Sequence, residues 1–532
     1  MIPARRVRHI ALFVVAGASA AAMFARAASS ESIDVILSNL PLRETAAYSR
    51  IYEAAGRPKR EVQEMSRSEV WTIPGEKWDA ILSLARDAGT KISKLDSNWN
   101  HVLVPMQNSG AMTASQSALL HAAMASKAVT GAIVMARPPA GLAENMLTKS
   151  ELVIPIATGI SVTARRMSLH KIEAGYAWHG VVSETGEPVT LLWWASGRMA
   201  GSITYRGHVY SVHELGGGTE AVVEMNPAQM PQEHAAMPRG MMEKMHLKQD
   251  PLVTKGDPSD LAGHGNVVRY NSRNPERATT KDVHDASPAA DAAIAPGPLD
   301  ITRKQALPQV SASKAVIRLI VAYTKAAASH YDDIKTDLIP LAIEDANESF
   351  RMSGITNVEL ELAYAYETDY IEAGSHFEHV FRFAGKNDGY MDEVHGLRDK
   401  YRADVGILIV DDANGCGLSA GVHVAAERAF AVVHHECAEN MYSLAHEIGH
   451  IIGARHDEAL DDSKKPFSYG HGYVSGKSWR TMMAYKDSCD GCPRVPVWSS
   501  PNILIRGVSA GDAESDNARV IVENAARVAG FR

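Results

Sequence analysis

Hydrophobic positions change their spacing along the chain, and the changes predict three regions. Before residue 247, segments 37–52 and 75–88 show partly helical spacing, whereas residues 152–213 alternate apolar and polar positions between short turns. That alternation predicts an antiparallel sheet. From about residue 247 to 310 no periodicity is sustained, and Pro, Asp, Ala, Ser and Asn dominate. This composition indicates a linker that is exposed to proteases.

From residue 313 onward the pattern becomes that of an α/β (α+β) domain. Apolar runs of strand length alternate with segments of helical periodicity. Strands are expected at residues 316–323, 358–366, 405–410, 418–424 and 430–433, and helices at 332–352, 388–401 and 516–528. One more helix is expected before residue 453, because apolar residues recur there at helical spacing and should face the core. These residues are Met441, Leu444, Ala445, Ile448 and Ile452.

The same expected helix carries two histidines away from its apolar stripe. His446 and His450 are four residues apart and share one face, so both imidazoles can bind one metal ion. Gly453 can adopt the left-handed conformation that ends a helix, and a chain that turns back there returns His456 to the same point. Three imidazoles leave one tetrahedral position open for water, as in catalytic rather than structural zinc sites. The sequence therefore predicts one catalytic Zn²⁺ ion.

Glu447 is the predicted general base of this site. It follows the first ligand, where it can take a proton from zinc-bound water. The whole pattern from His446 to Asp457 reads H-E-x-x-H-x-x-G-x-x-H-D, which is far rarer by chance than H-E-x-x-H alone. The alternative is a helix whose histidines are ordinary surface or core residues.

Composition limits the possible functions. A chain of 532 residues is expected to form two or three domains, and a hydrophobic content of 45% is enough for packed cores. The net charge of −8 argues against general nucleic-acid binding. Residues 313–532 hold 22 Lys and Arg against 33 Asp and Glu, whereas the rest of the chain is slightly basic. The two parts are therefore expected to attract one another weakly.

The N-terminus has the features of a secretory signal. Arg5, Arg6 and Arg8 precede an apolar run over residues 10–24, and Ala25–Ala27 offers an A-x-A cleavage site. A membrane anchor is the alternative, but the run is shorter than the roughly 20 residues that span a bilayer. We expect residues 1–27 to be a signal peptide and the protein to be secreted, either to the periplasm or outside the cell.

All four cysteines lie in the last quarter of the chain. An even number of cysteines in an exported protein indicates two disulfides, for which three pairings exist. We favour Cys416–Cys437 and Cys489–Cys492. A Cys₄ zinc site is the alternative, although C-x-x-C occurs only once.

These motifs resemble the metzincin zinc endopeptidases. Metzincins carry a methionine turn below the zinc, and in Thr481–Tyr485 the residue Met483 matches it, with an ordinary core methionine as the alternative. Asp457 is similar to the adamalysin (reprolysin-like) branch, in which this residue hydrogen-bonds to the backbone near the turn. The segments 481–485, 489–494 and 499–502 look closest to bacterial peptidyl-Asp metalloendopeptidases. The resemblance covers about 220 residues from Ser313.

The resemblance implies a metzincin-like catalytic domain over residues 313–532, with a twisted mixed sheet and a zinc-binding active-site helix. It also implies an edge strand at residues 418–424, to which a peptide substrate adds. Tyr485 is a candidate for stabilising the oxyanion, with core packing as the alternative.

The narrower resemblance implies cleavage at acidic residues, Asp in particular. An acidic domain repels such substrates, so the specificity pocket needs a local positive charge. In this family the chain after the methionine turn forms the pocket wall. Lys486 and Arg494 lie there and Arg480 lies just before the turn. The alternative for each is a cation that simply faces solvent.

Residues 28–247 are expected to form an α+β propeptide domain with an antiparallel sheet, joined to the catalytic domain by residues 248–312, where activation cleavage occurs. Residues 28–312 contain no cysteine, so a cysteine cannot silence the zinc. Latency must then come from a carboxylate, a histidine or steric blockade. The candidates are Glu233, His234 and the Met-rich segment 237–245. A permanent substrate- or matrix-binding domain is the alternative.

The sequence thus predicts a secreted zinc endopeptidase made as a zymogen, with protein or peptide substrates and its own propeptide as inhibitor. No nucleic acid and no stable membrane anchor are expected as partners. The alternatives are a non-catalytic zinc-binding or adhesion module on a metzincin fold, and an exopeptidase of similar fold.

Overall fold

The computed structural model describes residues 32–63, 68–94, 100–104, 112–137, 149–172, 175–194, 196–233, 299–305 and 314–532. Their contacts form two compact units that divide between Asp96 and Ser97. The expected signal segment, His234, residues 237–245 and the expected linker up to residue 298 lie outside the described residues. Within the described ranges, no helix has the length and apolar character needed to cross a membrane.

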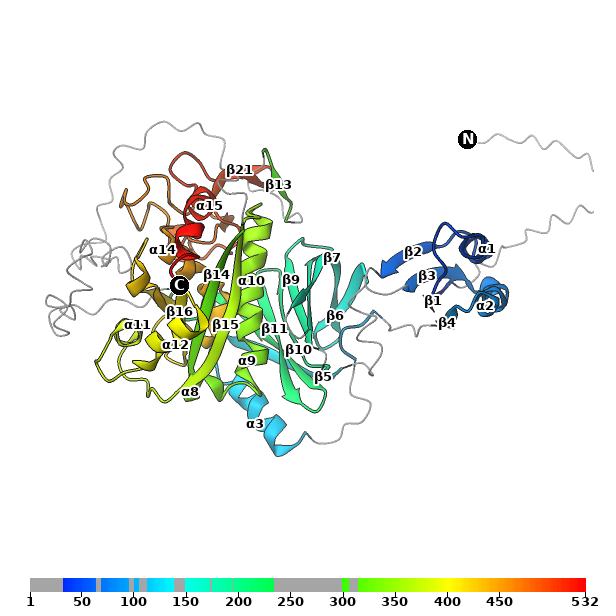
Figure 1. The fold of residues 1–532 in the computed structure, drawn as a ribbon, viewed down its shortest axis with the longest axis horizontal. Helices are drawn as coiled ribbons and strands as arrows, with labels where there is room; N and C mark the ends of the chain where they lie inside the picture. Colours follow the sequence, from blue (N-terminus) through cyan, green and yellow to red (C-terminus); the bar gives the residue numbers. More distant parts are fainter. Residues whose placement is uncertain are drawn as a thin grey trace, which may run out of the picture. The chain divides into compact units, whose positions relative to one another are not determined.

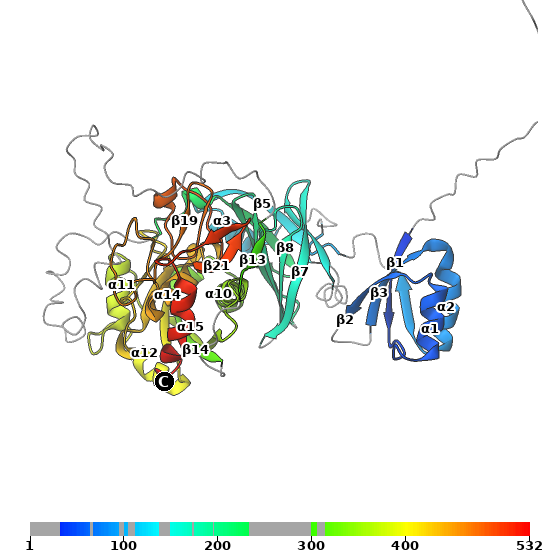
Figure 2. The ribbon, with the colours of Figure 1, turned by 90° about the horizontal axis from the view of Figure 1, so that it is seen from above.

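The first unit is a four-stranded antiparallel sheet with two helices on one side (Figure 2). The strand order is β2-β3-β1-β4, and buried Trp71, Ile51 and Ile81 form its core. The segment 37–52, expected to be partly helical, ends a strand first, and its helix begins only after Thr45, whose side chain accepts a hydrogen bond from the Tyr48 amide. The elements are β1 (Ser32–Ser38), α1 (Ala46–Ala54), β2 (Lys59–Gln63), β3 (Ser68–Pro74), η1 (Gly75–Lys77), α2 (Trp78–Asp87) and β4 (Lys91–Lys94).

The second unit begins with an eight-stranded antiparallel sheet (Figure 1). Its order, β5-β12-β11-β10-β9-β8-β7-β6, is mostly that of consecutive hairpins, so the alternating segment 152–213 forms antiparallel strands as predicted. The elements are α3 (Ala114–Ala123), β5 (Val129–Ala136), β6 (Glu151–Ala157), β7 (Ile160–Ile172), β8 (Gly175–Val182), β9 (Pro188–Trp194), β10 (Met199–Tyr205), β11 (His208–Gly216), β12 (Thr219–Met225) and η2 (Pro227–Gln229).

A five-stranded mixed sheet of order β15-β14-β16-β18-β17 follows in the same unit. Its strands are parallel except β17, an antiparallel edge strand. Strand β17 ends earlier than expected, at Ser419 rather than near residue 424, and the backbone that follows is left-handed at His423, which no extended strand contains. The strands are β14 (Ala315–Thr324), β15 (Val358–Thr368), β16 (Val405–Val410), β17 (Gly417–Ser419) and β18 (Phe430–His434).

The helices around this sheet differ from expectation at several ends. The helix expected over residues 332–352 is divided at Leu338, two residues before Pro340. The helix expected to start at residue 388 starts at Glu393, and α11 and α13 were not anticipated. The helices are α8 (Lys325–Ala328), α9 (Ile334–Asp337), α10 (Ile339–Met352), α11 (His376–Ala384), α12 (Glu393–Tyr401), η3 (Ala426–Arg428), α13 (His435–Asn440), α14 (Ser443–Ile452), η4 (Lys486–Cys489) and α15 (Asn517–Val528).

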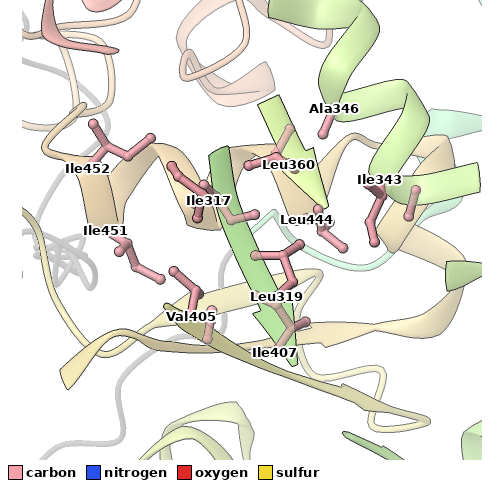
Figure 3. Close-up of a cluster of buried hydrophobic side chains, with 14 of the residues drawn as sticks. Ile317, Leu319, Ile343, Ala346, Leu360, Val405, Ile407, Leu444, Ile451 and Ile452 are labelled. Atoms are coloured by element: carbon pink, nitrogen blue, oxygen red, sulfur yellow. The ribbon is translucent and has the colours of Figure 1, made fainter. Parts of the chain in front are cut away.

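Helix α10 lies between the two large sheets (Figure 1). One side of it meets the five-stranded sheet and α14 in an apolar core (Figure 3). Leu341, on another side, packs against Leu192 and Ala200 of the eight-stranded sheet. The second unit therefore holds both sheets around one central helix.

Two small sheets complete the described part of this unit. Strand β13 (Ile301–Arg303) pairs with β21 (Ser500–Ile505), which also pairs with β22 (Val508–Ala510). The end of the expected linker is therefore a strand, because Ile301 packs with the apolar cluster around Ile503 and Ile505. Strands β19 (Val474–Ser475) and β20 (Trp479–Arg480) form a separate hairpin.

Candidate metal centre

Helix α14 is held in place by its apolar side. Leu444, Ile451 and Ile452 pack against side chains of β14 and β16, including Ile317 and Val405 (Figure 3). This packing uses Leu444, Ala445, Ile448 and Ile452 of the predicted stripe and adds Ile451, whereas Met441 packs in a different cluster, beside Cys416 and Cys437. It leaves His446 and His450 on the opposite side of the helix. The core therefore determines where the two imidazoles point.

Three imidazoles meet at one point. The Nε2 atom of His456 lies 3.3 Å from Nε2 of His446 and 2.8 Å from Nε2 of His450. Three nitrogen ligands on one tetrahedral zinc lie about 3.3 Å apart, since each Zn–N bond is about 2.0–2.1 Å long. All three residues are buried. The spacing and the donor set therefore suit one zinc ion.

The outer nitrogens of the imidazoles are held by backbone oxygens. Nδ1 of His446 lies 3.2 Å from the Met482 carbonyl, and Nδ1 of His450 lies 2.8 Å from the Ala454 carbonyl. Because a carbonyl only accepts, each Nδ1 carries the proton and each Nε2 presents a lone pair inward. Lone pairs that face one another repel unless they share a cation, so these residues fit a metal ion.

Glu447 follows His446 on α14, and its carboxylate lies against the first residue of the edge strand β17. A Cβ atom added to Gly417 would lie 2.6 Å from its Oε1, so the carboxylate touches the β17 backbone directly. Its Oε2 atom is buried and has no hydrogen-bond partner among the described residues. Burial raises the pKa of Glu447 well above its ordinary value, against the lowering effects of the Ser419 backbone and Arg494. A buried carboxylate oxygen without a partner is suited to accept a proton from a small molecule.

The helix ends where the sequence predicted. Gly453 has φ 137°, and a side chain there would meet Phe467 at 2.8 Å. One turn earlier, a Cβ on Gly449 would lie 3.0 Å from the Met483 sulfur and 2.7 Å from the Trp498 ring. Met483 therefore packs directly behind the helix, at the position expected of a turn methionine.

Asp457 connects the third histidine to the chain after this methionine. Its carboxylate accepts hydrogen bonds from the Tyr485 amide at 3.0 Å and from the Ser488 hydroxyl at 2.7 Å. Burial raises its pKa, partly opposed by the Ser488 hydrogen bond. The ring of Tyr485 lies 4.2 Å from that of His456, centroid to centroid. Tyr485 therefore lies at the metal centre, in contact with one ligand.

The three candidate pocket cations lie in different environments. Arg480 and Arg494 are buried, and both pair with Glu233. Lys486 is half-buried, and it is its backbone amide rather than its side chain that donates to Glu233. The two arginines thus lie together and share a carboxylate with the lysine backbone.

Both disulfides form in the pairing that the sequence favoured. Cys416–Cys437 joins the start of the edge strand to α13, and Cys489–Cys492 closes the loop after the methionine turn. Each lies in one wall beside the metal centre.

Two other clusters could hold a metal, and sequence spacing did not single them out. His170 and His179 of the eight-stranded sheet meet Glu344 of α10, while His330 and His435 meet Asp411. In the first cluster Glu344 lies 165 positions beyond His179, and in the second the three residues are spread over positions 330 to 435, so no local motif marks either cluster. Arg351 already donates to His179 and Glu344, which makes the first cluster a hydrogen-bonded network.

Comparison with known proteins finds metallo-peptidases. The model of metallo-peptidase family M12 matches residues 313–499. A peptidyl-Asp metalloendopeptidase of Xanthomonas campestris is 36% identical over 336 residues, which cover 63% of this chain and 67% of that protein. One of Stenotrophomonas maltophilia is 44% identical over 227 residues, 42% of this chain and 54% of that protein. One of Pseudomonas fragi is 36% identical over 179 residues, 33% of this chain and 94% of that protein.

Proposed function

This chain belongs to the bacterial peptidyl-Asp metalloendopeptidases, whose M12 metallo-peptidase domain it contains, and from this premise we propose that it is a secreted zinc endopeptidase, made as a zymogen, that hydrolyses peptide bonds at Asp residues. The alignment covers about two thirds of the Xanthomonas relative and about half of the Stenotrophomonas relative. The proposal for the whole protein therefore rests on the residues of its own site.

One observation carries the proposal. The Nε2 atoms of His446 and His450 lie 3.3 Å and 2.8 Å from Nε2 of His456, and Glu447, the residue after His446 on the same helix, has a buried Oε2 without a hydrogen-bond partner among the described residues. A site that only stores zinc does not need this carboxylate. A hydrolase does, because water must lose a proton as it attacks.

His446, His450 and His456 would hold the ion. Zinc bound by three imidazoles lowers the pKa of water to about 7 and polarises a peptide carbonyl. Glu447 accepts the proton of the attacking water and then delivers it to the amine that leaves. Asp457 keeps the Tyr485 amide and the Ser488 hydroxyl against the third ligand, which holds the walls of the site together.

The zymogen part of the proposal concerns the first half of the chain. Residues 1–27 would be removed on export, residues 28–247 would act as the propeptide and residues 248–312 would be cut on activation, leaving residues 313–532 as the protease. N-terminal sequencing of the secreted, active protein tests this. We expect an N-terminus near residue 300, and active enzyme that begins near residue 28 would contradict the zymogen.

The catalytic part is tested with a terminally blocked peptide that contains one Asp. We expect the wild type to cut it, and Glu447→Gln to cut it at least about 10³-fold more slowly with zinc still bound. Equal rates in the two proteins would instead support a non-catalytic zinc-binding or adhesion module. Cutting only of unblocked peptides would indicate an exopeptidase.

A further inference from the structure

Two buried guanidinium groups lie side by side near the methionine turn. Arg480 ends strand β20, and Arg494 follows the Cys489–Cys492 disulfide. Their backbones form a parallel bridge in which the Arg480 amide donates to the Pro493 carbonyl at 3.0 Å. The two side chains are only 4% and 6% exposed. Because two like charges removed from water destabilise one another, this pair needs an anion.

Glu233 supplies that anion from a distant part of the chain. Its Oε1 atom accepts hydrogen bonds from Nη2 of Arg494 at 2.9 Å and from Nη2 of Arg480. Its Oε2 atom accepts one from the Lys486 amide at 3.0 Å. Burial alone would raise the pKa of Glu233, but the charges of Arg494 and Arg480 lower it to about 2. The carboxylate is therefore ionised at neutral pH.

The segment that follows Met483 connects Glu233 to the metal centre. Lys486, which donates to Glu233, directly follows Tyr485. The Tyr485 ring in turn lies 4.2 Å from the ring of His456. Two residues thus separate the Glu233 carboxylate from a metal ligand.

The backbone before Glu233 contacts the opposite wall of the site. The Gln232 carbonyl accepts a hydrogen bond from the Cys416 amide at 2.7 Å. The next residue, Gly417, touches the Glu447 carboxylate. The segment 231–233 therefore runs between the edge strand and the methionine turn, the two walls that flank Glu447 and His456.

We propose that Arg480 and Arg494 form the pocket that binds the acidic side chain of the substrate, and that Glu233 fills this pocket in the uncut chain as a substrate-like carboxylate. This inference rests on the proposed protease function. It names the residues that recognise the substrate and the contact that keeps the uncut chain silent.

The electrostatics of the pocket favour this assignment. Once Glu233 leaves, the two buried guanidinium groups lose the carboxylate with which they form ion pairs, and an unpaired buried charge is strongly destabilising. A carboxylate of a substrate restores the pairing, whereas a neutral amide of the same shape does not. The pocket thus attracts acidic side chains although residues 313–532 are acidic overall.

An ordinary ion pair across the same interface offers a matched comparison. Arg198, in the turn between β9 and β10 of the eight-stranded sheet, pairs with Asp332 at 2.7 Å and with Asp337 of α9 at 2.8 Å. These residues contact neither Glu447 nor the three histidines among the interactions of the described residues. If Glu233 had a purely structural role, its substitution would affect the cleavage rate of the uncut chain no more than a substitution of Asp332.

The first test measures full-length protein before any backbone cleavage, verified by mass spectrometry. We expect Glu233→Gln to cut a blocked Asp-containing peptide about tenfold or more faster than the wild type in the first minutes. Glu233→Asp, which keeps the charge, should stay close to the slow wild type. Asp332→Asn should leave the rate unchanged. A folded Glu233→Gln protein at the wild-type rate, or Glu233→Asp as fast as Glu233→Gln, would overturn the proposal.

The second test measures specificity in the protein as processed by its host, with paired peptides that differ only in Asp or Asn. We expect the wild type to prefer Asp by about 100-fold in kcat/KM, and Arg494→Gln and Arg480→Gln to reduce this ratio towards one. Zinc content and thermal unfolding confirm that each variant is folded. If neither substitution misfolds and both keep the ratio, the pocket assignment is wrong while the protease stands. If the wild type cuts neither peptide, the proposed function itself fails.

Discussion

Two buried glutamates lie near the three histidines, and their carboxylates differ in their hydrogen-bond and ion-pair partners. Glu447 has a carboxylate oxygen with no partner and a pKa raised by burial, whereas Glu233 receives two guanidinium groups and a backbone amide, which lower its pKa to about 2. Burial is common to both, so it does not decide the role. The neighbours decide it: a carboxylate oxygen without a hydrogen-bond partner is suited to take up a proton, and a carboxylate that pairs with two arginines is suited to be bound as an anion.

The largest expected effect comes from removing a ligand on the Glu447 side. His456→Ala leaves only two imidazoles, so we expect zinc content to fall to near zero and peptide cleavage to fall by at least about 10³-fold. Zinc measured by mass spectrometry after dialysis checks the first effect. His208→Ala, in strand β11 of the eight-stranded sheet, is the control and should keep both the zinc content and the cleavage rate. Full zinc occupancy in His456→Ala would contradict the three-ligand site.

A third buried glutamate separates the effect of burial from that of the metal site. Glu439 of α13 accepts a hydrogen bond from Ser211 of the eight-stranded sheet, whose hydroxyl also contacts Asn440, and has no cation beside it in the described interactions. Burial, together with the nearby Asp345 and Asp337, raises its pKa to about 8, against the lowering effect of Ser211. Glu439 should therefore remain largely protonated at neutral pH in the folded protein.

This gives a pH prediction. Unfolded Glu releases its proton near pH 4.3, so between that pH and 8 the unfolded state binds fewer protons than the folded one. The contribution of Glu439 to the free energy of unfolding is thus fully present below about pH 4.3 and is lost as the pH rises towards 8. Glu439→Gln should remove roughly 2–4 kcal/mol of the fall in free energy of unfolding between pH 5 and 8, measured by urea titration. An unchanged pH slope would show that burial alone does not protonate this carboxyl.

A smaller effect is expected from crowding the back of the metal helix. Gly449→Ala places a methyl group against Met483 and Trp498, and overpacking of this kind costs about 1–3 kcal/mol of unfolding free energy. Gly396→Ala on α12 is the matched control, because nothing lies within 4 Å of its added Cβ. It should be neutral or slightly stabilising. If both variants unfold at the same denaturant concentration, Met483 does not support the helix as described.

The Glu447 side could be predicted from sequence because its signal is local. His446, Glu447, His450 and Gly453 lie within one helix and its end, so spacing alone places them together. The strands of residues 152–213 could be predicted equally well, because apolar and polar positions alternate there. The ends of elements could not, because the apolar pattern does not indicate the break at Leu338 or the early end of β17.

The role of Glu233 could not be predicted from the sequence, because its contacts are with residues far away in the chain. Glu233 lies 247 positions before Arg480 and 261 before Arg494. The absence of cysteine from residues 28–312 made a carboxylate one option for latency, and the family resemblance marked Arg494 as a pocket candidate. Only the folded chain, in which the segment after β12 lies beside Arg480 and Arg494, joins the two expectations into one set of ion pairs.

The most direct test of this account substitutes the two glutamates separately in the same full-length protein. Zinc content and early cleavage of a blocked Asp-containing peptide are measured for Glu447→Gln and Glu233→Gln. We expect both proteins to bind about one zinc per chain, with cleavage abolished in the first and accelerated in the second. Cleavage by Glu447→Gln at the wild-type rate would contradict the central claim that this carboxylate drives hydrolysis.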